Sequence, residues 1–208
     1  SKGKTGSDQS LYIVDGHSHL YKAFYAIRGL STADGVPTNA VYGFVQILHR
    51  MLESRQPDSL AVVFDPPGPT FRSEIYKAYK ANRPAAPEDL SAQIPWLRKI
   101  LEAMRIPVIV IEGVEADDVI ATLSQQARAK DLDVWIVSSD KDLYQLVGPG
   151  VRVLRLEPNR EIDIDAAEVR NRMGVGPDQI PDLLGLMGDS SDNIPGVPRV
   201  GQKTAAKL

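Results

Sequence analysis

Acidic side chains gathered at a few places give this sequence of 208 residues its strongest chemical signal. Nine of them either follow an apolar run or stand in close groups: Asp15, Asp65, Glu115, Asp117, Asp118, Asp140, Asp142, Asp189 and Asp192. Any one of these acids could simply cap a helix, because acids are favoured at the N-cap and in the first helical turn. Capping does not explain why the acids recur in pairs. Two carboxylates about 4 Å apart repel by roughly 4 kcal/mol at an effective dielectric near 20, so the pairs predict a neutralising partner.

Divalent cations are the simplest neutralising partner for such a cluster. Mg²⁺ and Mn²⁺ favour carboxylate and water ligands, and the chain has no cysteine that would favour softer metals. Two such cations about 4 Å apart can bind a phosphodiester, lower the pKa of a bound water and stabilise the leaving oxygen. The acids therefore predict hydrolysis of a phosphate ester with two or more metal ions per site. His17 and His19 follow Asp15 closely, but short His-x-His stretches are more often structural.

Short apolar runs must position these acids. The runs cover residues 11–14, 60–64, 108–111 and 134–138, and a further strand is expected near 151–155. Helical patterns lie between them over 41–52, from Pro87 onward, and over 116–129, with Pro95 expected to kink or divide the second. This alternation predicts an α/β fold with a twisted, mostly parallel central sheet flanked by helices.

The ends of the predicted strands bring most of the acids to one edge of the sheet. Asp15, Asp65 and Asp140 follow three of the runs, and the acidic group 115–118 follows the fourth after a short turn. In open parallel sheets the functional crevice lies beyond the carboxyl ends of the strands, so we expect the acids to converge there. Lys141 separates two of the acids, and on a strand or turn its side chain would point the other way.

The charge balance suits a nucleic-acid partner better than the net charge of −3 suggests. Setting the nine acids aside leaves 18 acids against 24 basic residues, a balance of +6 for the rest of the molecule. The absence of cysteine and of any apolar run long enough to cross a bilayer predicts a cytoplasmic protein without membrane contact, and a monomer is expected.

Basic and aromatic residues alternate just beyond Asp65. They are Arg72, Tyr76, Lys77, Tyr79, Lys80 and Arg83, and their spacing predicts one broad helical face. Such a face can neutralise phosphates and offer rings for stacking on unpaired bases. The alternative is a solvated amphipathic helix whose tyrosines cover the core.

A glycine-rich turn near the C-terminus is the second candidate for nucleic-acid contact. Its candidate residues are Gly196, Val197, Gly201, Lys203 and Thr204. A turn of this kind that opens a helix exposes backbone N–H groups that can hold a phosphate. A plain connector is the alternative.

Five motifs in order resemble the 5′-nuclease domain of bacterial DNA polymerase I, within the flap-endonuclease family. They begin at Tyr12 (YIVDGH), Val62 (VVFD), Glu115 (EADDV), Ser139 (SDKDLYQL) and Gly188 (GDSSDNIPG). The resemblance implies a PIN-like 5′-nuclease fold with a helical arch and a C-terminal helix-hairpin-helix. It also implies structure-specific cutting of 5′ flaps, with 5′→3′ exonuclease action, in DNA replication and repair.

The resemblance also implies roles for individual residues. Ligands of a first metal ion would be Asp15, Asp65, Glu115 and Asp117, and those around a second would be Asp140, Asp142, Asp189 and Asp192. Asp118 would assist either ion. Lys80 and Arg83 match basic positions of the arch, and Lys22 stands where the family carries a basic residue near the scissile phosphate.

Three segments are expected along the chain. Residues 1–10 are expected to form a flexible tail, 11–182 a nuclease core with the arch region at about 66–92, and 183–208 an acidic turn and the start of the helix-hairpin-helix, apparently truncated. A covalently linked polymerase module is an expected partner besides DNA. One alternative is a truncated DNA-binding fragment with impaired catalysis. Another is a phosphotransfer domain that is phosphorylated on Asp15 or Asp65, although Asp15-Gly-His lacks a second Asp two residues on.

Overall fold

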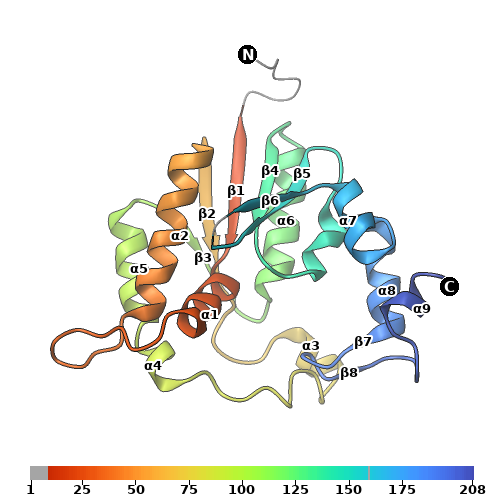
Figure 1. The fold of residues 1–208 in the computed structure, drawn as a ribbon, viewed down its shortest axis with the longest axis horizontal. Coiled ribbons are helices and arrows are strands. Elements are labelled where there is room, and N and C mark those ends of the chain that lie inside the picture. Colours follow the sequence, from red (N-terminus) through yellow and green to blue (C-terminus); the bar gives the residue numbers. More distant parts are fainter. Residues whose placement is uncertain (1–8, 159) are drawn as a thin grey trace.

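A mostly parallel sheet forms the centre of the molecule (Figure 1). The structure is a computed structural model, and it describes residues 9–158 and 160–208. Within these residues six strands lie in the order β3-β2-β1-β4-β5-β6. Their bounds are β1 (Ser10–Asp15), β2 (Ser59–Val63), β3 (Val108–Ile109), β4 (Asp133–Val137), β5 (Val151–Leu156) and β6 (Glu161–Ile164). The five predicted strands are confirmed, and β6, which runs antiparallel to β5, was not anticipated.

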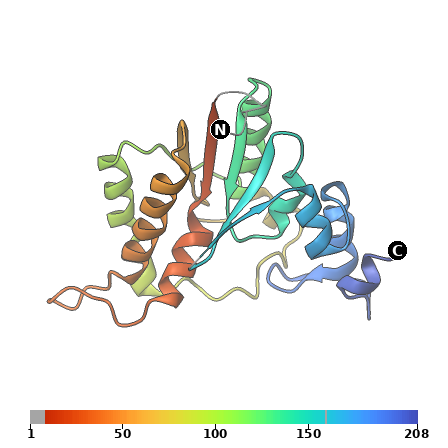
Figure 2. The ribbon, with the colours of Figure 1, turned by 45° about the horizontal axis from the view of Figure 1, so that its top comes forward.

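Helices cover both faces of the sheet, which explains why its strands read as continuous apolar runs. On one face Tyr12 and Val14 of β1 pack with α1 (Gly16–Ala26), α2 (Asn39–Arg55) and α5 (Ile94–Ala103). On the other face Ile13 packs with α6 (Ala116–Arg128), α7 (Ala166–Met173) and α8 (Ile180–Met187). Figure 2 shows the two helical layers on opposite sides of the strands. Alternate residues of one strand therefore serve two separate cores.

Pro95 divides the helical pattern that follows Pro87, as expected. The first piece is the short helix α4 (Glu88–Ser91), and the second is α5, which begins at Ile94. Proline lacks the N–H that an interior helical position must donate, but it is accommodated in the first turn of a helix. Pro95 thus lies where a new helix begins.

The segment from 71 to 83 is mostly not helical, so the prediction of one broad helical face for its basic and aromatic residues is wrong. Only α3 (Phe71–Ile75) forms, and residues 77–82 follow it as consecutive turns. Lys80 has a left-handed backbone with φ of 53°, and its N–H donates to the carbonyl of Asp192 at 2.9 Å. Contacts with a segment more than a hundred residues away therefore replace the helical hydrogen bonds that the local spacing suggested.

A small hairpin lies beyond the carboxyl ends of the strands, beside α3 and the turns that follow it (Figure 1). It consists of β7 (Gly188–Asp189) and β8 (Ile194–Pro195), between the 3-10 helix η2 (Pro177–Gln179) with α8 and the short helix α9 (Gln202–Ala205). The other 3-10 helix, η1 (Asp142–Leu146), follows β4. These elements together bring the C-terminal acids under the edge of the sheet.

The predicted tail falls almost wholly outside the described residues, because the description starts at Gln9. Ser10, which was assigned to the tail, is the first residue of β1. None of the helices within residues 9–158 and 160–208 combines the length and the apolarity that crossing a bilayer requires.

Candidate metal centre and nucleic-acid cleft

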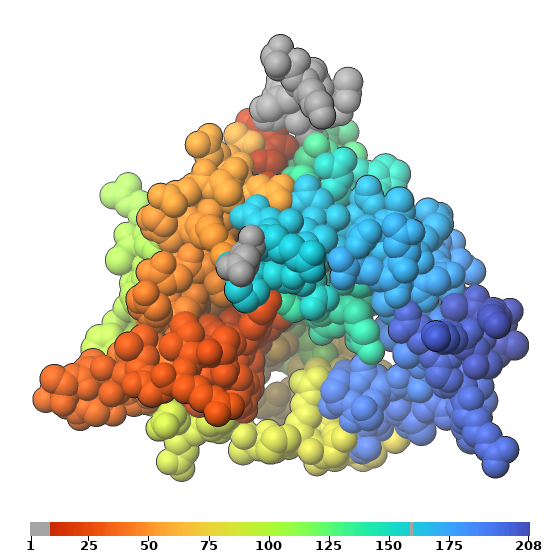
Figure 3. Space-filling model, in the orientation of Figure 1, coloured from red at the N-terminus to blue at the C-terminus, as the bar shows by residue number. Residues whose placement is uncertain are grey.

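A cleft of about 1010 Å³ lies at the carboxyl edge of the sheet and gathers eight of the nine acids. Those that line it are Asp15, Asp65, Glu115, Asp117, Asp140, Asp142, Asp189 and Asp192. Figure 3 shows an opening between α1 and the segment that follows α3. The acids come from the ends of β1, β2 and β4, the start of α6, and the hairpin β7–β8. The expected convergence of strand ends thus holds in the structure.

Asp15 is the most deeply placed of the strand-end acids, with a fractional exposure of 6%. It caps α1 by accepting the N–H of Ser18 at 3.1 Å, and its other oxygen accepts the hydroxyl of Ser138 at 2.7 Å. Burial raises the pKa of Asp15 to about 6 despite these two hydrogen bonds. The Ser138 hydroxyl also accepts the backbone N–H of Asp140 at 3.0 Å, which ties the ends of β1 and β4 together.

Asp117 and Asp142 carry the clearest signs of uncompensated negative charge. Burial, reinforced by the charges of Asp140, Asp15 and other acids, raises the pKa of Asp117 to about 8. Burial and then Asp140 raise the pKa of Asp142 to about 6. The Oδ1 atom of Asp142 is buried and has no hydrogen-bond partner among the described residues. A cation in the cleft would remove each of these penalties.

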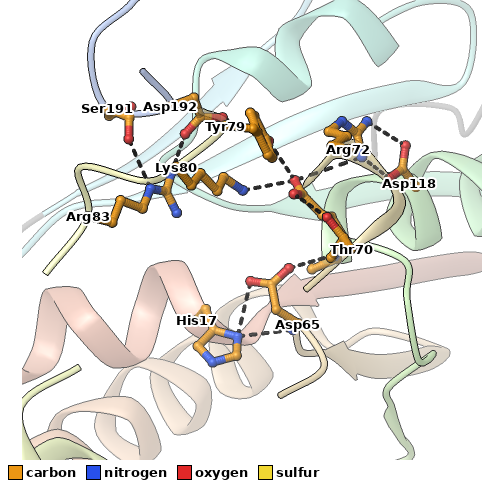
Figure 4. A network of polar contacts seen from close by, with 12 residues as sticks. His17, Asp65, Thr70, Arg72, Tyr79, Lys80, Arg83, Asp118, Ser191 and Asp192 are labelled. Atoms are coloured by element: carbon orange, nitrogen blue, oxygen red, sulfur yellow. Dashed lines mark hydrogen bonds and ion pairs between the residues drawn. The ribbon is translucent and has the colours of Figure 1, made fainter. Parts of the chain in front are cut away.

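Asp65 is held from both sides. Its Oδ1 accepts the N–H of Ala116 at 2.8 Å, which fixes it to the start of α6. Its own N–H donates to Nδ1 of His17 at 3.0 Å, and burial lowers the pKa of His17, so the imidazole is neutral there (Figure 4). A ring nitrogen that accepts a hydrogen bond carries no proton of its own. The 3.3 Å contact between Nδ1 and the Asp65 carboxylate is therefore not an ion pair. His17 therefore orients the Asp65 backbone.

His19 faces the core. Burial lowers its pKa to about 4, and its Nε2 lies 3.2 Å from the carbonyl of Val137. The structural interpretation of the His-x-His stretch thus suits His19, whereas His17 lines the cleft beside Asp65.

Basic side chains of the segment after α3 reach into the cleft and pair with acids (Figure 4). Lys80 Nζ lies 2.9 Å from Glu115 Oε2, and Arg83 pairs with Asp192. The hydroxyl of Tyr79 lies 3.0 Å from both Glu115 and Asp192, and its one proton serves one of them at a time. Burial acts to raise the pKa of Glu115, but the hydrogen bonds and charge of these partners bring it below its usual value.

Asp118 is the one acid of the nine that does not line the cleft. It forms a two-pronged ion pair with Arg72, with Nη2 to Oδ1 at 2.9 Å. Both residues line an adjoining pocket of about 520 Å³, which Tyr76 and Tyr79 also line. Lys77 is exposed. Each charge of the Arg72–Asp118 pair is therefore already balanced.

The other predicted nucleic-acid contacts lie outside the cleft. The ammonium of Lys22 donates to the carbonyl of Leu156 and lies 3.5 Å from the hydroxyl of Ser139. The glycine-rich turn leads into α9, where Lys203 and Thr204 are exposed and Gly201 is the N-cap. Gly196 packs against the backbone of Met187 and Gly188. The N–H of Val197 is already used, because it donates to the Leu186 carbonyl at 2.8 Å.

Two basic residues line the cleft although the sequence did not predict that they would. Lys141 was expected to point away, but it lines the cleft with its Nζ 3.7 Å from Asp189 Oδ2. The reason is local, because Lys141 is a helical-backbone residue that opens η1 and not part of an alternating strand. Arg155 of β5 also lines the cleft, and its only signal in the sequence is that a charged residue interrupts an apolar strand.

The donor set fits a hard divalent cation. Carboxylate oxygens from several elements surround one cleft, and one of them, on Asp142, is buried and unpartnered. Across the described ranges, no group of three or more histidine or acidic side chains is already arranged to hold a metal ion. Lys80, Arg83 and Lys141 neutralise part of the cluster instead.

Two family models cover nearly the whole chain. The model of the 5′-3′ exonuclease N-terminal resolvase-like domain matches residues 10–174, and that of the 5′-3′ exonuclease C-terminal SAM fold matches residues 175–208. The chain belongs to the 5′-3′ exonuclease family. This membership confirms the resemblance drawn from the five motifs.

Relatives within the 5′-3′ exonuclease family differ in length. The chain is 47% identical over 203 residues to DNA polymerase I of Pseudomonas aeruginosa, covering 97% of this chain and 22% of that protein. It is 44% identical over 200 residues to the 5′-3′ exonuclease of Aquifex aeolicus, covering 96% of this chain and 68% of that protein. The chain thus spans about a fifth of the polymerase and about two thirds of the exonuclease.

The fold also matches a solved member of this kind of nuclease. The T5 5′-exonuclease with bound zinc ions superposes with a TM-score of 0.77 at 24% identity, covering 96% of this chain and 74% of that one. This likeness supports the mostly parallel sheet with flanking helices as a shared architecture.

Proposed function

We propose that this chain hydrolyses DNA phosphodiesters at 5′ ends and at the base of 5′ flaps, with two or more Mg²⁺ or Mn²⁺ ions held by the acids of the cleft. The observation that carries the proposal is the gathering of eight carboxylates around one cleft, where burial and like charge raise the pKa of Asp117 to about 8. Membership of the 5′-3′ exonuclease family supports it. So does the flap endonuclease of bacteriophage T5, which has been solved with DNA and metal ions.

Two groups of acids would hold the ions. Those at the first ion would be Asp15, Asp65, Glu115 and Asp117, and those at the second would be Asp140, Asp142, Asp189 and Asp192. Bound divalent ions supply the positive charge that orients a phosphodiester, activates water and stabilises the leaving oxygen. Asp118 would act indirectly, through its pair with Arg72 at the start of α6.

Basic residues of the chain would bind and orient the DNA. Lys80 and Arg83 already lie in the cleft, and release from Glu115 and Asp192 would turn their charges toward a phosphate. Single-stranded DNA would meet Arg72, Tyr76, Lys77 and Tyr79, and the duplex backbone would meet the region from Gly196 to Thr204. Lys22 lies outside the cleft beside Ser139, and it would reach the DNA after its hydrogen bond with Leu156 is broken.

The proposed setting is DNA replication and repair in the cytoplasm. In a longer protein such as the polymerase relatives, the partner would be a covalently linked polymerase module. The chain itself would act as a monomer.

The test uses DNA with a labelled 5′ flap. Wild-type protein with Mg²⁺ or Mn²⁺ should cut near the junction. Asp140→Asn should lower the cutting rate by more than about 100-fold, because loss of a metal ligand should cost more than loss of a residue that only hydrogen-bonds to a ligand. The matched control is Asp178→Asn, which changes an exposed acid outside the cleft and should cut like the wild type.

Two outcomes would contradict the proposal. Undiminished cutting by Asp140→Asn would refute the assignment of the site. Flap binding by the wild type without cutting at any metal concentration would instead indicate a DNA-binding module.

A further inference from the structure

The segment from 76 to 83 carries the basic groups that lie over the acids, yet it is poorly anchored by packing. Six of its eight residues, 77–82, form consecutive turns, and Tyr79 is its one buried residue. A segment with so little buried surface opens readily unless hydrogen bonds hold it. The position of Lys80 and Arg83 therefore depends on what the segment is bonded to.

The partner of this segment is the turn from 190 to 193, between β7 and β8. The amide nitrogen of the Asn193 side chain donates to the carbonyl of Ala78 at 2.7 Å. In return the N–H of Lys80 donates to the carbonyl of Asp192 at 2.9 Å. Two further bonds join Asn82 to the Ser190 carbonyl at 2.8 Å and Arg83 to the Ser191 carbonyl at 3.0 Å.

Asn193 differs from the other members of this set in where its side chain lies. Asp192, its neighbour, lines the cleft and pairs with Arg83, whereas Asn193 does not line the cleft and reaches the backbone of the segment instead. The backbone of Asn193 is left-handed, with φ of 58°, and asparagine tolerates this conformation better than most residues. The position thus combines a rare backbone geometry with a side-chain donor aimed at Ala78.

We propose that Asn193 is a positioning residue that fixes the segment 76–83, and with it Lys80 and Arg83, over the acidic cleft. The catalytic consequence rests on the proposed function, because it assumes that Lys80 and Arg83 act on DNA there. The mechanical part does not depend on that function, since it concerns only how the segment is held.

The mechanical part is tested by limited digestion with trypsin in the absence of DNA. Trypsin cleaves after Lys77 and Lys80, whereas Pro84 protects the bond after Arg83. Asn193→Gly keeps the left-handed backbone and removes the amide, so cleavage in the segment should rise about five-fold, the factor expected from losing one such hydrogen bond. Asn193→Asp, which places a carboxylate oxygen against the Ala78 carbonyl, serves as a second variant should Asn193→Gly fold poorly.

A matched control makes the result specific. Asn171→Asp changes an exposed asparagine on α7 and should leave cleavage in the segment unchanged. A cleavage rate in both Asn193 variants equal to that of the wild type would overturn the proposal, because the remaining bonds of the segment would then hold it without the Asn193 amide.

The catalytic consequence is tested by a double-mutant cycle on the flap. Asn193→Gly should lower kcat in the wild type by up to about five-fold, with a smaller change in KM, and should have little effect in a Lys80→Ala/Arg83→Ala background. Equal losses in both backgrounds would show that Asn193 does not act through these two residues. If the wild type cuts no flap, the proposed function fails, while the trypsin result still decides whether Asn193 holds the segment.

Discussion

Asp117 carries the largest visible penalty for gathering acids in one place. Its pKa rises from the usual 3.8 to about 8, first through burial and then through the charges of Asp140 and Asp15. Asp15 and Asp142 follow, with pKa values near 6. In the pH range between 4 and 8 the folded, metal-free protein therefore binds protons that the unfolded chain has released.

The sign of the resulting pH dependence is opposite to that of an ordinary salt-bridged acid. Because the folded state holds more protons, the contribution of these three acids to the free energy of unfolding falls as pH rises from about 4 to about 8. The metal-free protein should melt at a lower temperature at pH 8 than at pH 5. Asp117→Asn should raise the Tm at pH 8 by at least about 3 °C, since it removes a charge penalty worth more than about 1 kcal/mol.

Thermal melts in EDTA at pH 5 and pH 8 measure this effect, with Asp178→Asn as the control for the loss of an exposed acid. Mg²⁺ should raise the Tm of the wild type more at pH 8 than at pH 5, because the cation competes with protons for the same oxygens. If the Tm does not depend on pH and Asp117→Asn leaves it unchanged, burial does not raise the pKa of these carboxyl groups.

At the scale of residues, the acids were predictable and their partners were not. Asp15, Asp65 and Asp140 follow apolar runs directly, so their convergence follows from the geometry of parallel strands. The hydroxyl of Ser138 donates to Asp15, and the imidazole of His17 accepts the N–H of Asp65. Both bonds join residues far apart in the sequence, where no local pattern predicts them. The roles assigned to individual metal ligands remain predictions.

At the scale of elements, the hairpin β7–β8 depends on glycines that let two backbones touch. Gly188 has φ of 71°, and a Cβ on Gly196 would overlap the carbonyl of Met187. Gly196→Ala must therefore push apart the two strands of this hairpin, which holds Asp189 on β7 and Asp192 in its turn. We expect it to lower the free energy of unfolding by about 1–3 kcal/mol and to weaken metal binding.

Gly185→Ala is the matched control for this prediction. It lies on α8 with no atom within 4 Å of the added Cβ, so the same substitution should leave metal binding intact. It should stabilise the helix by about 0.5–1 kcal/mol. Calorimetric Mn²⁺ titrations and thermal melts compare the two variants, and equal behaviour of both would refute the close packing at Gly196.

Elements were predictable where burial imposes a period and not where distant bonds decide. Strands β1, β2, β4 and β5 are apolar because both of their faces are covered, and α2 shows a clear amphipathic spacing. The basic and aromatic residues of the segment from 76 to 83 have helical spacing too. The N–H of Lys80, however, donates to the carbonyl of Asp192 and not to a carbonyl of the preceding helical turn. Such long-range bonds leave no periodic trace in a sequence.

At the scale of the whole molecule, sheet order explains why one cleft collects the acids. Strands β2, β1 and β4 are adjacent in the centre of the sheet, so the residues that follow them meet at one edge. The alternation of strands and helices predicted this edge. The placement of Asp189 and Asp192 against it depends on how the C-terminal helices pack, and only the resemblance to known nucleases anticipated it.

The charge distribution indicates that divalent cations are needed for phosphate binding as well as for hydrolysis. The residues outside the acidic cluster have a charge balance of +6, which would attract DNA. The cleft itself would repel phosphate as long as its acids are balanced only in part by Lys80, Arg83 and Lys141. Divalent cations would convert the repulsive cleft into one that binds phosphate. The proposed cleavage of DNA therefore depends on metal ions entering the acidic cleft.

The most direct test is the rate at which wild-type protein cuts a 5′-labelled flap as the concentration of Mg²⁺ is raised from an EDTA baseline. We predict no cutting in EDTA, recovery with Mg²⁺ or Mn²⁺, and a rise steeper than first order at low metal concentration, because two ions act together. Cutting that continues undiminished in EDTA would contradict hydrolysis by metal ions held in the acidic cleft.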